Sequence, residues 1–191
     1  MSHDTLLFIV SAPSGAGKTS LCREVINLVP DLHFSVSCTT RPARQHEKNG
    51  IDYYFLPYDR FMRMVEEDQL VEWTKIYGNY YGTAKSTIEE CRKNNKDVIF
   101  DIDHIGAQRI KKAYNNSITI FILPPSYSEL QERLNQRGTD SEGVIRTRLN
   151  KAKQEIDQAS WYQYQIVNDN FDEALTRLKE IITTERLKKK P

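Results

Sequence analysis

The segment Ser11–Ser20 has the residue types and spacing of a loop that binds nucleotide phosphates. Gly15 and Gly17 come just before Lys18 and Thr19. Glycine lets the backbone curl so that successive N–H groups face phosphate oxygens, and a following helix start adds partial positive charge. A lysine here reaches the β- and γ-phosphates, and a threonine hydroxyl can bind Mg²⁺. The segment therefore predicts binding of a nucleoside triphosphate with magnesium.

The flanking sequence supports this interpretation. The apolar run Leu6–Val10 precedes the loop and a helical pattern over Lys18–Val29 follows it. Strand, glycine-rich turn and helix is the arrangement that such a loop requires. Ala12 departs from the usual G-x-x-x-x-G-K-[ST] pattern, and alanine fits there only if its φ stays negative. A chance glycine-rich turn is the alternative, and the loop alone does not identify a phosphoryl acceptor.

The remaining elements predict an α/β fold. Apolar runs typical of buried strands cover Leu6–Val10, Asp97–Ile102, Ile118–Leu123 and Tyr164–Val167. Helical patterns separate them, over Lys18–Val29, His104–Ala113, Ser126–Arg137, Val144–Ala159 and Phe171–Lys188. Alternating strands and helices predict a parallel sheet with helices on both faces.

Two segments interrupt this alternation. Residues 34–85 contain strand-like pieces and a helical pattern, at Phe34–Ser37, Asp52–Phe55, Leu70–Ile76 and Asp59–Glu67. We expect an inserted lobe with mixed α and β structure there. The link Arg137–Glu142 contains glycine and joins two polar helices, which favours a short lid over residues 126–159. The core of this single domain, residues 1–191, would then be residues 1–33, 86–125 and 160–191.

Composition narrows the class of protein. Of 191 residues, 39% are hydrophobic and 28% charged, and the net charge of +1 argues against a surface that coats nucleic acid. Cys22, Cys38 and Cys91 are far apart and form no C-x-x-C pair, so a reducing compartment is expected. The apolar runs are too short to span a membrane. The phosphate loop begins too close to the first residue for a cleaved signal, so we expect a cytoplasmic protein.

Four further groups of polar residues suggest the acceptor. They are Ser37–Arg44 with Gly50–Phe55, Val71–Trp73 with Tyr77–Thr83, Phe100–Gly106, and Arg137–Thr139 with Arg146–Arg148. In these motifs and their order, the chain resembles the guanylate kinase family, nucleoside monophosphate kinases that convert GMP and ATP to GDP and ADP. The resemblance runs from about Leu6 to the C-terminal helical pattern. It implies ATP, GMP and dGMP as substrates and leaves the oligomeric state open.

The resemblance implies that Arg41, Arg44, Tyr53 and Tyr81 hold the acceptor phosphate. Planar guanidinium groups suit phosphate oxygens, and phenol hydroxyls add neutral donors. A solvated basic loop and tyrosines at the edge of the core are the structural alternatives.

The resemblance also implies a guanine site at Ser37, Glu72, Thr83 and Asp103. Guanine presents N1–H and N2–H₂ side by side, so one carboxylate can accept from both, whereas adenine presents a bare N1 acceptor there. Without the resemblance, Glu72 between Val71 and Trp73 would be interpreted as a solvent-facing residue of an alternating strand.

Two carboxylates near the carboxyl end of the strand Asp97–Ile102 are expected to bind the metal and the base. Asp101 lies at the carboxyl end of that strand, where it would hold Mg²⁺ through water together with Thr19. Asp103 falls two residues later on the same side. A helix N-cap is the alternative for Asp103, and both roles can coexist.

The remaining site residues follow from the same resemblance. Arg137 and Arg148 match lid arginines, whereas surface positions are favoured for Arg133 and Arg146. Asn168 matches a position near the adenine of ATP, or it is simply a loop residue after a strand. The expected ATP-binding set is Ser14, Gly15, Ala16, Gly17, Lys18, Thr19, Ser20 and Asn168. The expected catalytic set is Lys18, Arg41, Arg44, Arg137 and Arg148.

No protein base is expected, because the acceptor phosphate is already a nucleophile near neutral pH. Catalysis would rest on positioning and on neutralisation of charge. Three alternatives remain: a guanylate-kinase-like interaction module without activity, a kinase for AMP or a pyrimidine monophosphate, and a simple NTPase.

Overall fold

A computed structural model describes residues 5–76, 78–136 and 142–189. Its centre is a parallel sheet with strand order β2-β7-β1-β8-β9. The five strands are β1 (Leu7–Ser11), β2 (Leu32–Ser35), β7 (Asp97–Asp101), β8 (Ile118–Leu123) and β9 (Tyr164–Val167). The chain therefore has the predicted parallel core, in which the strand before the phosphate loop lies at the centre of the sheet.

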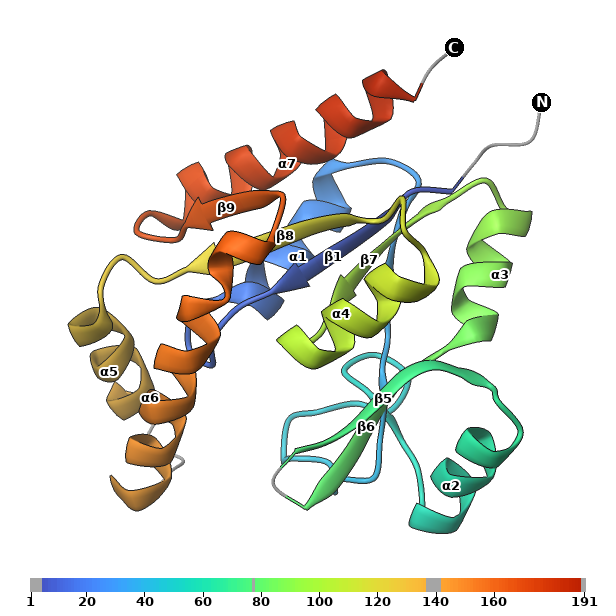
Figure 1. Ribbon diagram of the computed structural model, residues 1–191, viewed down its shortest axis with the longest axis horizontal. Helices are drawn as coiled ribbons and strands as arrows, with labels where there is room; N and C mark the ends of the chain where they lie inside the picture. Colours follow the sequence, from blue (N-terminus) through green and yellow to red (C-terminus); the bar gives the residue numbers. More distant parts are fainter. Residues whose placement is uncertain (1–4, 77, 137–141, 190–191) are drawn as a thin grey trace.

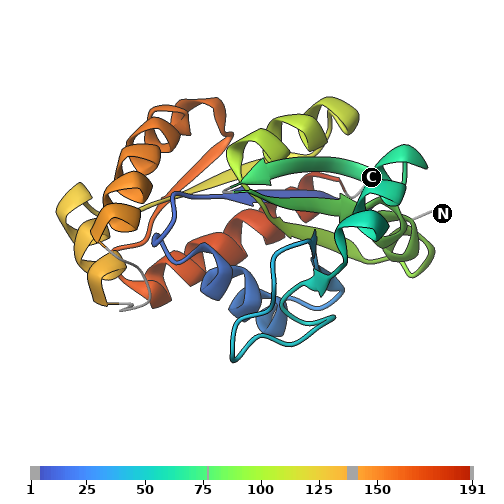
Figure 2. The ribbon, with the colours of Figure 1, turned by 90° about the horizontal axis from the view of Figure 1, so that it is seen from below.

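Helices cover both faces of this sheet (Figures 1 and 2). On one face lie α1 (Lys18–Leu28) and α7 (Phe171–Lys188), and on the other lie α3 (Lys85–Lys93) and α4 (His104–Ala113). Side chains of a strand alternate between the faces, so Phe8 packs toward α1 and α7 whereas Ile9 packs toward α4. Burial on both faces explains why the central strands are continuous apolar runs.

A second, mixed sheet forms the inserted lobe, with strand order β4-β3-β6-β5. Its elements are β3 (Cys38–Thr39), β4 (Tyr54–Phe55), α2 (Tyr58–Glu66), β5 (Leu70–Ile76) and β6 (Asn79–Ala84). Cys38, Phe61 and Leu70 form its own small apolar core. Figure 1 shows this lobe at the lower right, beyond the carboxyl end of β7.

The start of the lobe differs from the sequence-based expectation. We expected Phe34–Ser37 to be a strand of the lobe, but Phe34 and Ser35 belong to β2 at the edge of the main sheet, where they pair with Ile99 and Phe100 of β7. A short alternating strand carries no signal for which sheet it joins. The lobe's sheet begins only at Cys38.

Two further helices, α5 (Tyr127–Gln136) and α6 (Glu142–Asp157), pack against each other through Leu130, Leu134, Leu149 and Ala152. The expected link between them, from Arg137 onward, lies outside the described residues as far as Ser141. The short helix η1 (Ala159–Trp161) then leads into β9. The helix pair lies opposite the inserted lobe, at the lower left of Figure 1.

Candidate active site

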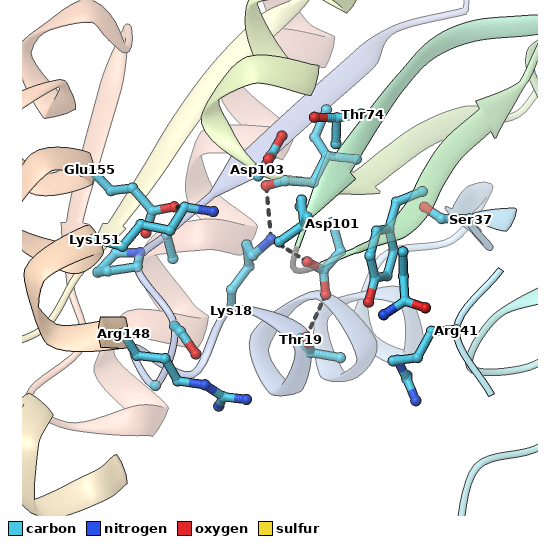
Figure 3. Close-up of a pocket in the computed structure, with 18 of the residues that line it drawn as sticks. Lys18, Thr19, Ser37, Arg41, Thr74, Asp101, Asp103, Arg148, Lys151 and Glu155 are labelled. Atoms are coloured by element: carbon cyan, nitrogen blue, oxygen red, sulfur yellow. Dashed lines mark hydrogen bonds and ion pairs between the residues drawn. The ribbon is translucent and has the colours of Figure 1, made fainter. Parts of the chain in front are cut away.

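A cavity of about 900 Å³ lies where the phosphate loop, the inserted lobe and α6 meet. Figure 3 shows Lys18 and Asp101 at its centre, with Ser37 and Arg41 on one side and residues of α6 on the other. Its volume is at the upper end of the range for small-molecule sites. Most of the predicted site residues line this one cavity.

The phosphate loop has the backbone geometry that its glycines predict. Gly15 and Gly17 have φ values of 100° and 88°, a region that side chains rarely adopt. Gly17 is also the N-cap of α1, and the first residues of this helix line the cavity, so the partial positive charge of the helix start lies beside it. Ala12 is not among the described non-glycine residues with positive φ, so alanine is tolerated there, as expected.

Lys18 and Thr19 are both tied to Asp101 at the end of β7. The Lys18 ammonium forms an ion pair with this carboxylate and donates to the Ile102 carbonyl at 2.8 Å. Burial acts to lower the pKa of Lys18, but the Asp101 carboxylate outweighs this and raises it. Thr19 Oγ1 donates to the other Asp101 oxygen at 2.5 Å. Lys18 is thus a fixed, charged group at the centre of the cavity.

Arg41 lies on the lobe side of the cavity and is held by Glu47. Two hydrogen bonds of 2.9 and 2.7 Å join the guanidinium to the two Glu47 oxygens. Glu47 also accepts from the Arg44 backbone N–H at 2.8 Å. The hydrogen bond from Arg41 keeps the pKa of Glu47 below its usual value. Glu47 was missed in the sequence, because acidic residues in a polar loop carry no distinctive pattern.

The two predicted tyrosines lie next to Arg41. The Arg41 guanidinium lies over the Tyr53 ring, 5.4 Å from its centroid, and Tyr53 meets Tyr81 edge to face at 6.0 Å. The Arg44 side chain is exposed at the same side of the cavity. The structure therefore brings together all four residues predicted to hold the acceptor phosphate.

Arg23 links this side of the site to the core and was also missed. Its guanidinium reaches from α1 to the Ile51 carbonyl at 3.0 Å and to the Asp52 carboxylate at 2.9 Å. The loop that carries Tyr53 is therefore connected directly to the helix that begins at the phosphate loop.

Glu72 lies on β5 with a side chain that is almost fully buried. The residue is 5% exposed, and its Oε1 accepts from Thr83 Oγ1 at 2.7 Å. Burial raises the pKa of Glu72 to about 7; nearby Asp103 adds to this effect, whereas the Thr83 hydrogen bond and Arg109 oppose it. Buried carboxylates are rare without a partner that uses them. The solvent-facing alternative for Glu72 is therefore wrong.

Asp103 and Ser37 complete this part of the cavity lining. Asp103 is the N-cap of α4, and its carboxylate accepts from the Gly106 N–H at 2.8 Å. The N-cap alternative is thus confirmed, and the same side chain still lines the cavity. Thr83 does not line the cavity: it is fully buried behind Glu72 and contacts it.

The opposite side of the cavity comes from α6. Arg148, Lys151 and Glu155 all line it, and Lys151 Nζ lies 3.5 Å from Glu155 Oε1. Burial raises the pKa of Glu155, a residue that the sequence did not single out. Arg137, the other expected lid arginine, lies outside the described residues. Arg146 is exposed, as its surface interpretation predicts.

Asn168 is buried against the phosphate loop. Its amide donates to the Ala16 carbonyl at 2.7 Å, and the residue is 5% exposed. A Cβ at Gly17 would lie 2.3 Å from the Asn168 amide nitrogen, so the loop and this side chain fit only because residue 17 is glycine. Arg133 donates to the Asn168 carbonyl at 3.1 Å and pairs with Glu129. Asn168 and Arg133 do not line the cavity themselves; they join the end of β9 to the phosphate loop and to α5.

Comparisons with known proteins show which family shares this sequence and fold. The family model described as guanylate kinase matches residues 4–185. Guanylate kinases of Geobacter metallireducens and Geobacter sulfurreducens are 49% and 48% identical, and each alignment covers 97% of this chain and 92% of the relative. The crystal structure of guanylate kinase from Anaplasma phagocytophilum is 29% identical with a TM-score of 0.79, covering 96% of this chain and 87% of that one. This chain belongs to the guanylate kinase family.

Proposed function

We propose that this protein transfers the γ-phosphoryl group of ATP to GMP, giving ADP and GDP, and that dGMP is a further acceptor. One observation supports this most strongly. The phosphate loop with its paired Lys18, and the buried hydrogen-bond acceptor Glu72, line the same cavity. The first suits a nucleoside triphosphate, and the second suits a base that offers adjacent N–H donors. A simple NTPase does not need the buried glutamate.

The base is proposed to be guanine because Glu72 is a buried acceptor. Its Oε1 is occupied by the Thr83 hydroxyl, so the remaining lone pairs of the carboxylate are available to guanine N1–H and N2–H₂. Asp103 and Ser37 line the same part of the cavity. Adenine would place its N1 lone pair against the carboxylate, and a buried polar mismatch of this kind is strongly rejected.

The acceptor phosphate is proposed to lie between Arg41, Arg44, Tyr53 and Tyr81. Glu47 accepts from both terminal nitrogens of Arg41, and the Pro42 carbonyl accepts from Nη1 at 2.7 Å, so the plane of the guanidinium is fixed. Its Nη2 and Nε are the nitrogens proposed to donate to phosphate. Because the phosphate is largely dianionic near neutral pH, it can attack without a protein base. The work of this chain is then to align two polyanions and offset their charge.

Lys18 is proposed to move from its partners to the transferring phosphate. In the structure its ammonium contacts Asp101 and the Ile102 carbonyl, which keeps it charged and beside the phosphate loop until the phosphate replaces these partners. Arg148 of α6 and Arg137 are proposed to approach the same phosphate when the lid closes. We retain the division into a core, a GMP-binding lobe near residues 34–85 and a lid near residues 126–159 as part of this proposal.

Magnesium is proposed as the cofactor. Thr19 Oγ1 and the Asp101 carboxylate are adjacent hard oxygen donors beside the phosphate loop, which fits Mg²⁺ bound through few protein ligands and several waters. The ion would supply charge neutralisation between the β- and γ-phosphates. Asp101 would hold it through water, and the Thr19 hydroxyl would bind it directly.

The compartment is proposed to be the cytoplasm. All three cysteines are free and buried, which fits a reducing environment. None of the helices in the described part of the chain has the length and apolar character needed to cross a bilayer.

The test is ADP formation from Mg-ATP with GMP, AMP, CMP and UMP supplied separately. Strong turnover with GMP alone is expected. Equal turnover with AMP would remove guanine recognition from the proposal. If protein that melts cooperatively turned over none of them, the inactive interaction module would be supported instead.

A further inference from the structure

Gly106 lies where a glycine has no conformational advantage. It is the third residue of α4, it is buried, and its φ is not in the positive region that favours glycine. Glycine inside a helix costs about 1 kcal/mol relative to alanine. A buried helical glycine therefore points to a need for space at the position that a side chain would fill.

That space is occupied by the Glu72 carboxyl group. A Cβ built on Gly106 would lie 2.9 Å from Glu72 Oε2 and 3.2 Å from its Cδ, and 3.3 Å from Asp103 Oδ1. The first of these distances is shorter than a real Cβ contact, and the other two are tighter than most such contacts, so the Glu72 carboxyl group would have to shift. Glu72 Oε1 is fixed on its other side by Thr83, so the carboxylate fits between β6 and α4 only because residue 106 has no side chain.

The Gly106 backbone also acts on the neighbouring acid. Its N–H donates to Asp103 Oδ1 at 2.8 Å, which fixes the second carboxylate of this part of the cavity. One residue thus sets the positions of two carboxylates, one through its missing side chain and one through its N–H.

We propose that Gly106 is a specificity-determining positioning residue, which acts on the guanine base through Glu72. This inference rests on the proposed function, because it assumes that Glu72 receives guanine N–H groups. A methyl group at residue 106 displaces the end of a side chain, a change that a folded protein accommodates easily. The methyl group should instead weaken recognition of the base. A displacement of the Glu72 carboxylate by a fraction of an ångström misaligns its hydrogen bonds with guanine N1–H and N2–H₂.

The first experiment compares Gly106→Ala with the wild type, using GMP and inosine monophosphate as acceptors. Inosine monophosphate lacks the 2-amino group and therefore depends less on Glu72. We expect kcat/KM for GMP to fall about tenfold or more, mainly through KM, with the KM for ATP unchanged. The ratio of kcat/KM for GMP over inosine monophosphate should fall at least about threefold. Gln108→Ala, on the exposed side of the same helix, is the control and should leave both values unchanged.

A purely structural role for Gly106 predicts a different result. If the methyl group only disturbed the packing of α4, both acceptors would lose activity equally and the melting temperature would fall. We expect the melting temperature of Gly106→Ala to be equal to or above that of the wild type, because alanine favours the helix. Equal losses with the two acceptors, or an unchanged KM for GMP, would overturn the proposal.

A double-mutant cycle with Glu72→Gln tests whether the effect passes through Glu72. We expect Gly106→Ala to cost much less in the Glu72→Gln background, because the interaction that it disturbs is already lost. Fully additive losses would contradict the proposal. If the wild type did not phosphorylate GMP, the proposed function itself would be wrong. This outcome is measured with the wild type alone and does not depend on the Gly106 variant.

Discussion

Lowering the pH through neutrality should weaken GMP binding through protonation of Glu72. Glu72 is 5% exposed, and burial raises the pKa of its carboxyl group to about 7. Guanine N–H groups need the ionised form, because a protonated carboxyl offers a hydrogen where the base offers another. Binding must therefore select the ionised fraction of the empty protein, and this fraction falls as the pH falls.

The size of the effect follows from that pKa. With a pKa of about 7, roughly 91% of Glu72 is ionised at about pH 8 and roughly 9% at about pH 6. The apparent Kd is the intrinsic Kd divided by the ionised fraction. The Glu72 contribution to Kd should thus rise about tenfold over this range. The GMP phosphate, with a second pKa near 6, adds its own smaller rise.

Isothermal titration of GMP into wild type and Glu72→Gln separates the two contributions. The glutamine variant has no proton to lose at this position, so only the phosphate titrates. We expect the ratio of Kd at about pH 6 to Kd at about pH 8 to be roughly tenfold larger for the wild type. At about pH 7, titration in buffers of different ionisation enthalpy should report release of about half a proton from the Glu72 carboxyl.

Parallel pH profiles for the two proteins would refute this reasoning. Such a result would mean either that Glu72 is ionised throughout this range, or that it does not receive the base. Loss of GMP binding by Glu72→Gln at high pH would distinguish the two, since only a base-binding Glu72 predicts it.

Three further predictions concern other contacts of the site. Lys18→Ala should reduce kcat by about 100-fold or more without loss of cooperative melting; near-normal turnover would remove Lys18 from catalysis. Glu47→Gln removes the charge and one of the two acceptor oxygens that hold the Arg41 guanidinium, and should raise the KM for GMP severalfold while the KM for ATP stays constant. An equal rise in both would argue against a role specific to the acceptor. Asn168→Ala leaves the Ala16 carbonyl without its donor, which should lower the free energy of unfolding by about 1–3 kcal/mol and weaken binding of both Mg-ADP and inorganic tripolyphosphate. Weakened binding of Mg-ADP alone would instead indicate that Asn168 contacts adenine.

The parallel core could be predicted from sequence because each element carries a local signal. Strand β8 and helices α4 and α7 begin and end where their patterns predict, since strands buried on both faces are unbroken apolar runs and the helices have polar ends. Helix α3 was not predicted. It buries only Ile88 and Cys91, and two apolar residues three apart are too few to define a helical face. Strand β6 was also not predicted, because its Asn, Tyr and Gly residues are typical of turns as well.

The candidate site could be predicted only where chemistry follows from spacing in the chain. The phosphate loop is contiguous, so Gly15, Gly17 and Lys18 indicate it directly. Glu72 was selected by resemblance to a family, because its burial depends on α4, which the sequence cannot place against β5. Glu47 and Gly106 were missed as site residues for the same reason. The role of Glu47 depends on its hydrogen bonds with Arg41, and the role of Gly106 depends on the Glu72 carboxyl group beside it; only folding creates these contacts.

The most direct test of the proposed transfer follows the phosphorus atoms themselves. ³¹P NMR of the wild type with Mg-ATP and GMP should show ADP and GDP appearing in equal amounts, with no inorganic phosphate beyond the background of a sample without protein. Appearance of inorganic phosphate in place of GDP would contradict phosphoryl transfer to GMP, because it would mean that water reaches the γ-phosphate in this site.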